Sequence, residues 1–279
     1  MATWRSFASI CAMAPETLDD LTARMQCLLG NPAISDCANR KGNRAQSAKL
    51  LEDAYVGMTK ALSPELSVEI GAHEAGFSRR VMAAVPELNA IAFEANPHVY
   101  EKYLPGLRAE TLDYRNLAIC ATAGPVKLWM PRTWQNAAFP PANAISSVRQ
   151  RTNDDFAYDI VTVDGLPLDD ALAGLTYETA VAWIDVEGAQ REILEGAPTF
   201  LSRALAIYIE LETIEVWQGQ DTAAAITKTL KQCGFRAVMR DAIARVQFNE
   251  VFVRTEPGIL HQATQAAAAY VERLERLLR

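Results

Sequence analysis

Four carboxylates follow two apolar runs in the second half of the chain. Asp185 ends the run VAWID and Glu187 follows shortly after it, while Glu210 and Glu212 close the run IYIELE. Neighbouring parallel strands end at the same edge of a sheet, and alternate residues of a strand share a face, so these side chains are expected to converge. A carboxylate there can accept a proton from a hydroxyl, and several together can hold a hard cation such as Mg²⁺.

Asp185 and Glu187 are therefore the catalytic candidates, and Asp185, Glu187, Glu210 and Glu212 are the candidate metal ligands. Asp185 is the first candidate for the catalytic base. A charged side chain at the end of a buried strand costs free energy, so we expect it to have a function. For Glu187 a structural alternative stays open, namely capping of the N-terminus of the next helix.

A second acidic pair surrounds a glycine turn in the first half of the chain. Leu66 to Ile70 is typical of a buried strand, Gly71 of a sharp turn, and Ala90 to Phe93 of a second strand that ends in Glu94, with a helix closed by Pro86 between them. This is half of a mononucleotide-binding unit, whose ligand lies at the carboxyl ends of the strands. Glu94 is placed to accept hydrogen bonds from both hydroxyls of a ribose.

The other carboxylate, Glu69, decides between ligands. It precedes the glycine and would repel a pyrophosphate, whereas the sulfonium and ammonium groups of S-adenosylmethionine would be attracted. The segment Gly71 to Gly76, GAHEAG, also departs from the G-x-G-x-x-G fingerprint. S-adenosylmethionine is thus the favoured cofactor, with an NAD-dependent oxidoreductase as an alternative. An ordinary turn, in which Glu69 caps the helix, is the alternative that needs no ligand.

Four segments in this order resemble the FkbM-type family of S-adenosylmethionine-dependent methyltransferases: VEIGAHEAGFS, IAFEANPHVYEKY, TVDGLPLDDAL and WIDVEGAQREILEGAP. The resemblance covers about Leu66 to Val253, and IDVEGAQ is its most characteristic part. It implies a class I methyltransferase fold and methyl transfer to a hydroxyl of a sugar, glycan or secondary metabolite. The family usually has glycine where Ala75 stands. A non-catalytic member acting as a scaffold is therefore a third alternative.

The resemblance and the turn together give a set of candidate cofactor-binding residues. They are Glu69, Gly71, Ala72, His73, Gly76, Phe77, Ser78, Glu94, Ala95, Asn96, Asp113, Asn116 and Asp185. Asp113 and Asn116 enter by resemblance only, as contacts to the edge of the adenine. Alternatively, Asp113 and Asn116 are turn residues that cap a strand and do not contact a ligand.

Alternating strand and helix patterns predict an α/β protein. With the resemblance, we expect a mostly parallel, seven-stranded, Rossmann-like sheet with helices on both faces. We expect an N-terminal helical cap over residues 1–62, with helices at Pro15 to Leu29 and Ala45 to Leu62 and a loop over 31–43. The methyltransferase domain is expected over residues 63–256.

Residues 257–279 are predicted to form an amphipathic helix, because apolar residues repeat with heptad spacing. The seam is too short to stand alone, so it either packs on its own domain or forms a homodimer.

Two shorter predictions concern the middle of the chain. A third strand is expected at Asn116 to Cys120, and a long loop from Arg132 to Asp159. The loop contains Trp134, Phe139, Arg149 and Arg151, which could contact a sugar ring or an anionic acceptor, or only anchor the loop.

Composition narrows the partners. The chain has 27 basic and 34 acidic residues among 279, which argues against nucleic acid as a ligand. Five cysteines without metal-site spacing suit a reducing compartment, and no apolar run approaches the ~18 residues of a membrane span. We expect a cytoplasmic enzyme with a small-molecule or glycan acceptor.

Overall fold

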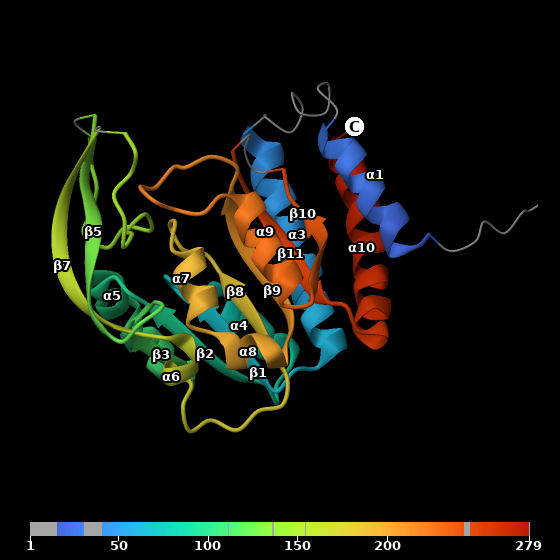
Figure 1. Cartoon of the computed structure of the whole chain (residues 1–279), viewed down its shortest axis with the longest axis horizontal. Coiled ribbons are helices and arrows are strands. Elements are labelled where there is room, and N and C mark those ends of the chain that lie inside the picture. The colour runs from blue at the N-terminus through green and yellow to red at the C-terminus, as the bar shows by residue number, and fades with distance from the viewer. Residues whose placement is uncertain are drawn as a thin grey trace, which may run out of the picture.

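Seven strands form the central sheet, in the order β10-β11-β9-β8-β1-β2-β3 (Figure 1). The structure is a computed structural model that describes residues 16–30, 41–110, 112–135, 137–153, 155–242 and 246–278. The strands are β1 Leu66–Ile70, β2 Asn89–Glu94, β3 Asp113–Asn116, β8 Ala180–Ile184, β9 Ala204–Glu212, β10 Phe235–Arg240 and β11 Gln247–Arg254. Only β11 runs antiparallel to its neighbours in this sheet. The predicted mostly parallel α/β fold of the class I methyltransferase type is confirmed.

The direction of the strand order reverses beside β1, which pairs in parallel with both β2 and β8. Ile70 is level with Phe93 on one side and with Ile184 on the other. Gly71 and Asp185, which follow β1 and β8, and Glu94, which ends β2, therefore lie at one edge of the sheet. In open α/β sheets a ligand crevice forms at this position.

Helices cover both faces of the sheet, as predicted (Figure 1). One face packs against α6 Leu168–Ala171, α7 Gln190–Glu195, α8 Pro198–Arg203 and α9 Ala223–Gln232. The other packs against α1 Leu18–Gly30, α3 Lys41–Leu62, α4 Gly76–Ala84 and α10 Pro257–Leu278, with α5 Pro97–Leu107 and the short η1 Arg108–Glu110 following β2. β1 is buried along its whole length, because both of its faces are covered.

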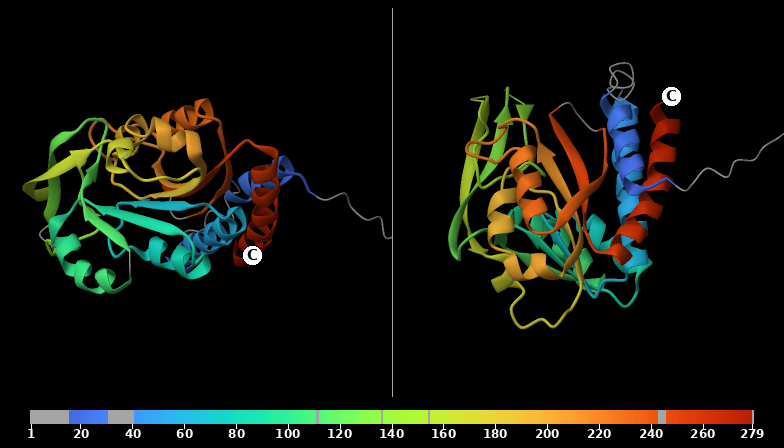
Figure 2. Two further views of the ribbon diagram at one scale, coloured as in Figure 1. Left: turned by 90° about the horizontal axis from the view of Figure 1, so that it is seen from below. Right: turned by 45° about the vertical axis from the view of Figure 1, so that its right-hand side comes forward.

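The terminal helices form one layer, in which α10 lies beside α1 and α3 (Figure 2). Four residues of the heptad seam, Ala263, Ala267, Tyr270 and Leu274, are buried within this chain. The seam thus packs on its own domain. A homodimer through the C-terminal helix stays a prediction, and it would have to use the outer face of α10.

The two helices predicted near the N-terminus are present as α1 and α3, with other bounds. The predicted loop over 31–43 is wrong for its last residues, because α3 already begins at Lys41. Residues 1–15 and 31–40 lie outside the described residues, so Pro15 and most of that loop are not described. Among the helices that the structure describes, none is long and apolar enough to cross a bilayer.

A second sheet corrects the predictions for the middle of the chain. Its strands, in the order β4-β7-β5-β6, are β4 Ala118–Ile119, β5 Gly124–Trp134, β6 Ala137–Ala138 and β7 Phe156–Leu166. The predicted strand Asn116 to Cys120 is therefore split between two sheets. The predicted loop from Arg132 to Asp159 is wrong at both ends, since strand residues occupy them and only 139–155 connect β6 to β7.

Candidate functional site

A crevice opens at the carboxyl ends of β1, β2 and β8, where the order of the strands reverses. It holds about 630 Å³ of space free of protein atoms, part of it open to solvent. One wall comes from Gly71, Glu94 and Asp185, and the opposite wall from the second sheet and the 139–155 segment. Among the described residues, no lysine or arginine lines it.

Gly71 has a backbone conformation and a position that favour glycine. Its φ is +76°, and a Cβ atom there would lie 1.9 Å from the carbonyl oxygen of Asp185. The N–H groups of Gly71 and Ala72 both donate to Phe93 O at 3.0 Å, and the N–H of Asp185 donates to Ile70 O at 3.0 Å. The three strand ends are thus fastened together through the backbone.

Glu94 lies on the crevice wall and is 9% exposed. Its Oε2 accepts the N–H of His73 at 2.8 Å, and its Oε1 accepts the N–H of Asn96 at 2.7 Å. Burial raises the pKa of Glu94, although these backbone hydrogen bonds oppose the rise. Each oxygen has a further lone pair, so the carboxylate can still accept hydroxyl groups from the crevice.

The turn between Ala72 and Gly76 contains two residues other than glycine with positive φ, His73 at 46° and Ala75 at 54°. Left-handed backbone costs such residues about 1–2 kcal/mol. The turn is supported by Tyr114, whose hydroxyl donates to His73 O at 2.6 Å. Ala72 and His73, both predicted to bind the cofactor, do not line the crevice; their N–H groups hold Phe93 and Glu94, and the His73 ring packs against Tyr103.

Glu69 does not line the crevice, which corrects its predicted role. Its carboxylate is 3% exposed and accepts the N–H groups of Phe77 at 3.2 Å and Ser78 at 2.7 Å. It caps the N-terminus of α4, as the alternative without a ligand predicted. Burial raises the pKa of Glu69 to about 7, against the hydrogen bonds from Ser78 and Phe77. Gly76, Phe77 and Ser78, the first residues of α4, do not line the crevice either.

Asp113 and Asn116 are placed differently from each other. Asp113 is level with Ile91, away from the carboxyl edge, and its carboxylate binds the guanidinium of Arg115 at 2.9 Å. The structure does not bring it to the crevice, because β3 begins earlier than predicted. Asn116 is level with Glu94 and donates its amide to Glu94 O at 2.8 Å.

The crevice lining beyond β3 is apolar and was missed. Leu117, Ala118, Ile119 and Leu128 line it beside Ala95, which the sequence did predict. The only signal for the others is the short apolar run LAI, which predicts a strand of the central sheet. Such a surface suits the flat face of an adenine.

Asn96 has three roles that its position after β2 did not reveal. Its side-chain oxygen accepts the N–H of His98 at 2.9 Å and so caps α5. Its amide nitrogen donates to Pro141 O and to Ser146 Oγ, both at 2.9 Å. It therefore holds the 139–155 segment over the crevice beside Glu94.

Asp185 is exposed to the crevice directly after β8. Desolvation by the surrounding protein raises the pKa of its carboxyl. Glu187 is half-buried and also lines the crevice; burial raises the pKa of Glu187, and the charge of Asp185 raises it further. The N-cap residue of α7 is Ala189, so the capping alternative for Glu187 is wrong.

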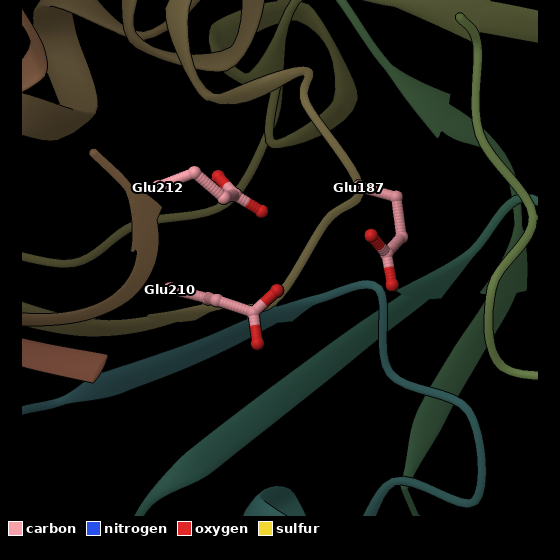
Figure 3. A group of neighbouring side chains, drawn as sticks. All are labelled: Glu187, Glu210 and Glu212. Atoms are coloured by element: carbon pink, nitrogen blue, oxygen red, sulfur yellow. The ribbon is translucent and has the colours of Figure 1, made fainter. Parts of the chain in front are cut away.

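Glu187, Glu210 and Glu212 come together, with one carboxylate oxygen of each within 4.8 Å of the others (Figure 3). Asp185, the fourth predicted ligand, is not part of this group. The predicted convergence of β8 and β9 carboxylates is thus confirmed for three of the four residues.

Residues 69–237 match the family described as the methyltransferase FkbM domain. The chain belongs to this family. The match begins within β1 and ends within β10, so that α1, α3 and α10 lie outside the FkbM domain. The Ala75 position, glycine by resemblance to the family, has the left-handed backbone that explains a preference for glycine.

Solved structures of methyltransferases resemble the chain at low identity. The magnesium protoporphyrin IX methyltransferase ChlM from Synechocystis PCC 6803, solved with bound SAM, is 11% identical with a TM-score of 0.43, over 84% of this chain and 90% of that one. The precorrin-6y C5,15-methyltransferase from Geobacter metallireducens GS-15 is 13% identical with a TM-score of 0.39, over 78% and 90%. EvdMO1 is 12% identical with a TM-score of 0.40, over 77% of this FkbM-family chain but only 42% of its own length. No curated protein matches the chain.

Proposed function

We propose that this FkbM-family protein is an S-adenosylmethionine-dependent O-methyltransferase that acts on a hydroxyl of a sugar, glycan or secondary metabolite. The observation that carries the proposal is the meeting of the Gly71 turn, Glu94 and Asp185 in one crevice at the edge of the sheet. The family gives methyl transfer, and the hydroxyl acceptor is our inference.

The crevice fits the cofactor in three respects. The Glu94 carboxylate can accept the two ribose hydroxyls, and Leu117 to Ile119 offer an apolar surface to the adenine. Asp185 presents a negative charge near the turn, which favours a ligand with cationic groups. When bound, S-adenosylmethionine supplies an activated methyl group on a positively charged sulfur.

The same features disfavour the alternatives. A pyrophosphate would meet Glu94 and Asp185 in a crevice whose described lining has no lysine or arginine. An NAD-dependent oxidoreductase is therefore not favoured. The turn also argues against a scaffold that has lost cofactor binding. The N–H of Ala75 donates to Ala72 O at 2.6 Å, so the loop is formed with alanine in place of glycine at position 75.

The acceptor proton is assigned to Asp185, with Glu187 as the second candidate. A raised pKa makes a carboxylate a better base toward an alcohol than one with its ordinary value. The 139–155 segment closes this side of the crevice through Asn96 and through the hydroxyl of Ser147, which donates to Glu187 O. It limits access of water, which would compete with the acceptor. The proposal places the reaction in the cytoplasm and involves no nucleic acid.

Calorimetry with S-adenosylhomocysteine and with NAD tests the proposal on the intact chain. We expect S-adenosylhomocysteine to bind at one site and NAD to give no heat of binding. If only NAD binds, the oxidoreductase alternative is established. If neither ligand binds, the non-catalytic scaffold is the alternative that remains. The acceptor is then sought with S-adenosylmethionine and a panel of sugars and hydroxylated metabolites, with mass spectrometry detecting a gain of one methyl group.

A further inference from the structure

Three glutamates from two segments point into a common space at the end of β9 (Figure 3). Glu210 and Glu212 are alternate residues of β9 and share a face, while Glu187 reaches them from the loop after β8. One carboxylate oxygen of each lies within 4.8 Å of the other two. Glu187 also lines the crevice, so this space adjoins the proposed active site.

The group is buried and has unused acceptor atoms. Glu210 is 8% exposed and Glu212 is 2% exposed. In the part of the chain that the structure describes, Glu187 Oε2, Glu210 Oε1 and Glu212 Oε1 have no hydrogen bond of ordinary geometry. The nearest side-chain donors, on Trp217, Gln247 and Gln190, lie close enough to oppose the rise in the pKa of Glu187, Glu210 and Glu212 in turn. Buried carboxylate oxygens without partners are rare and costly, so a ligand that satisfies them is expected.

No basic side chain of the described residues forms an ion pair with any of the three glutamates. Arg151 is close enough for its charge to favour the ionised forms of Glu187 and Glu212. Its guanidinium, however, lies over the rings of Trp217 at 4.5 Å and Phe156 at 5.3 Å. Among the described residues, the three glutamates therefore have Arg151 nearby but no ion-pair partner.

Neighbouring groups hold the glutamates in place, as is usual for metal ligands. Gln220 Nε2 donates to Glu212 Oε2 at 2.9 Å. Gln190 Nε2 donates to Val186 O at 2.9 Å and to Glu210 O at 3.0 Å, which ties the two segments together. Beside Glu187, a Cβ atom on Gly188 would lie 2.7 Å from the Trp217 side chain, so a glycine there lets that ring pack on the loop.

We propose that Glu187, Glu210 and Glu212 bind one hard divalent cation, of the class of Mg²⁺, Mn²⁺ and Ca²⁺. Three carboxylate oxygens suit such ions, and the 4.8 Å limit is about twice the metal–oxygen distance of Ca²⁺. For Mg²⁺, whose bonds to oxygen are about 2.1 Å, the carboxylates would have to move closer together. The site itself does not depend on methyl transfer. That the ion polarises the acceptor hydroxyl beside Glu187 is a further step, which rests on the proposed function.

The test is a titration of the full-length, chelator-treated protein with MnCl₂, MgCl₂ and CaCl₂ in the absence of S-adenosylmethionine. We expect one Mn²⁺ per chain, with a dissociation constant of about 10⁻⁵–10⁻³ M, and a higher melting temperature in its presence. Glu210→Gln and Glu212→Gln should each weaken binding at least about tenfold, because each removes a charged ligand. Glu195→Gln, which changes an exposed glutamate of α7, should bind Mn²⁺ like the parent.

The outcomes separate the metal site from the enzyme activity. Absence of Mn²⁺, Mg²⁺ and Ca²⁺ binding at millimolar concentration, or Glu→Gln variants that bind as tightly as the parent, overturns the site. Circular dichroism and binding of S-adenosylhomocysteine report whether each variant is folded. If Glu210→Gln or Glu212→Gln does not fold, Glu187→Gln replaces it. We expect this variant at the crevice wall to lose Mn²⁺ affinity to the same extent. Cation binding without S-adenosylhomocysteine binding would refute the proposed function and leave the metal site standing.

Discussion

The α-carbon of Gly71 lies so close to Asp185 that a Cβ atom on it would be 1.9 Å from the Asp185 carbonyl oxygen. The turn proposed to hold the cofactor and the residue proposed to take the acceptor proton therefore touch through their backbones. Because Asp185 N also donates to Ile70 O, the position of Asp185 depends on the end of β1. The geometry of the proposed site is set by this contact.

Gly71→Ala is expected to abolish binding of S-adenosylhomocysteine. It should also lower the free energy of unfolding by more than about 1–2 kcal/mol, which is the cost of left-handed backbone for an alanine. The backbone would have to move, because the Cβ atom of the alanine would meet the carbonyl oxygen of Asp185. Gly174→Ala is the matched control: φ there is +85°, and among the described atoms nothing lies within 4 Å of its Cβ position. Urea unfolding measures both variants. If Gly71→Ala and Gly174→Ala lowered the free energy of unfolding equally, a role for the contact between Gly71 and Asp185 would be contradicted.

Glu94→Ala should weaken binding of S-adenosylhomocysteine by about 1.5–3 kcal/mol, the range for hydrogen bonds to charged groups. The structure adds a second expectation, because the change also leaves the N–H groups of His73 and Asn96 without their acceptor. The melting temperature should fall as well. Calorimetry measures the affinity, with exposed Glu101→Ala as the control. A folded Glu94→Ala variant with the parent's affinity would remove Glu94 from the site.

The central sheet was predictable because β1, β8 and β9 are apolar runs buried on both faces. The carboxyl ends follow from the strands, so Asp185 after β8 and Glu94 at the end of β2 could be placed from the sequence alone. The second sheet was not predictable in the same way. The runs VKLWMP in β5 and Ile160 to Val163 in β7 do predict short strands, but the sequence does not show that each strand extends to 11 residues or that the two pair in a separate sheet.

Side-chain roles that depend on the packing of a second element could not be decided from the sequence. Glu69 reaches the free N–H groups of α4, and these are near only once the helix is docked on the sheet. Tyr114 supports the turn from β3, between the two residues that the resemblance singled out. Asp113 shows the effect of register, since an earlier start of β3 takes it away from the crevice.

Ala75→Gly is expected to keep S-adenosylhomocysteine binding and to change stability by less than about 1 kcal/mol. The glycine relieves left-handed strain but makes the unfolded chain more flexible, and these effects oppose each other. Ala75→Val should cost more than about 2 kcal/mol, because a branched residue is strained there and the site is fully buried. Chemical unfolding measures both variants. Loss of binding in Ala75→Gly would show that the alanine itself is needed.

The carboxyl of Glu69 should make stability depend on pH. Its pKa is raised from 4.5 to about 7 by burial, so between these values the folded protein holds a proton that the unfolded chain releases. This contribution is therefore present below pH 4.5 and is lost as the pH rises through 7. Glu69→Gln should lose less stability than the parent between pH 5 and pH 8, whereas exposed Glu87→Gln should behave like the parent. Identical slopes in all three proteins would rule out this role for Glu69.

Asp185→Asn separates catalysis from cofactor binding, because it keeps the shape of the side chain and removes the charge. If Asp185 takes the acceptor proton, kcat should fall by about 10²–10⁴, the usual contribution of a general base, while S-adenosylhomocysteine binds with little change. If its charge instead attracts the cationic groups of the cofactor, affinity should fall and kcat at saturation should survive. Asp185 is exposed to the crevice and is not one of the three clustered glutamates, so Mn²⁺ affinity should be retained in either case. Turnover and affinity both close to those of the parent would leave Asp185 with a structural role alone.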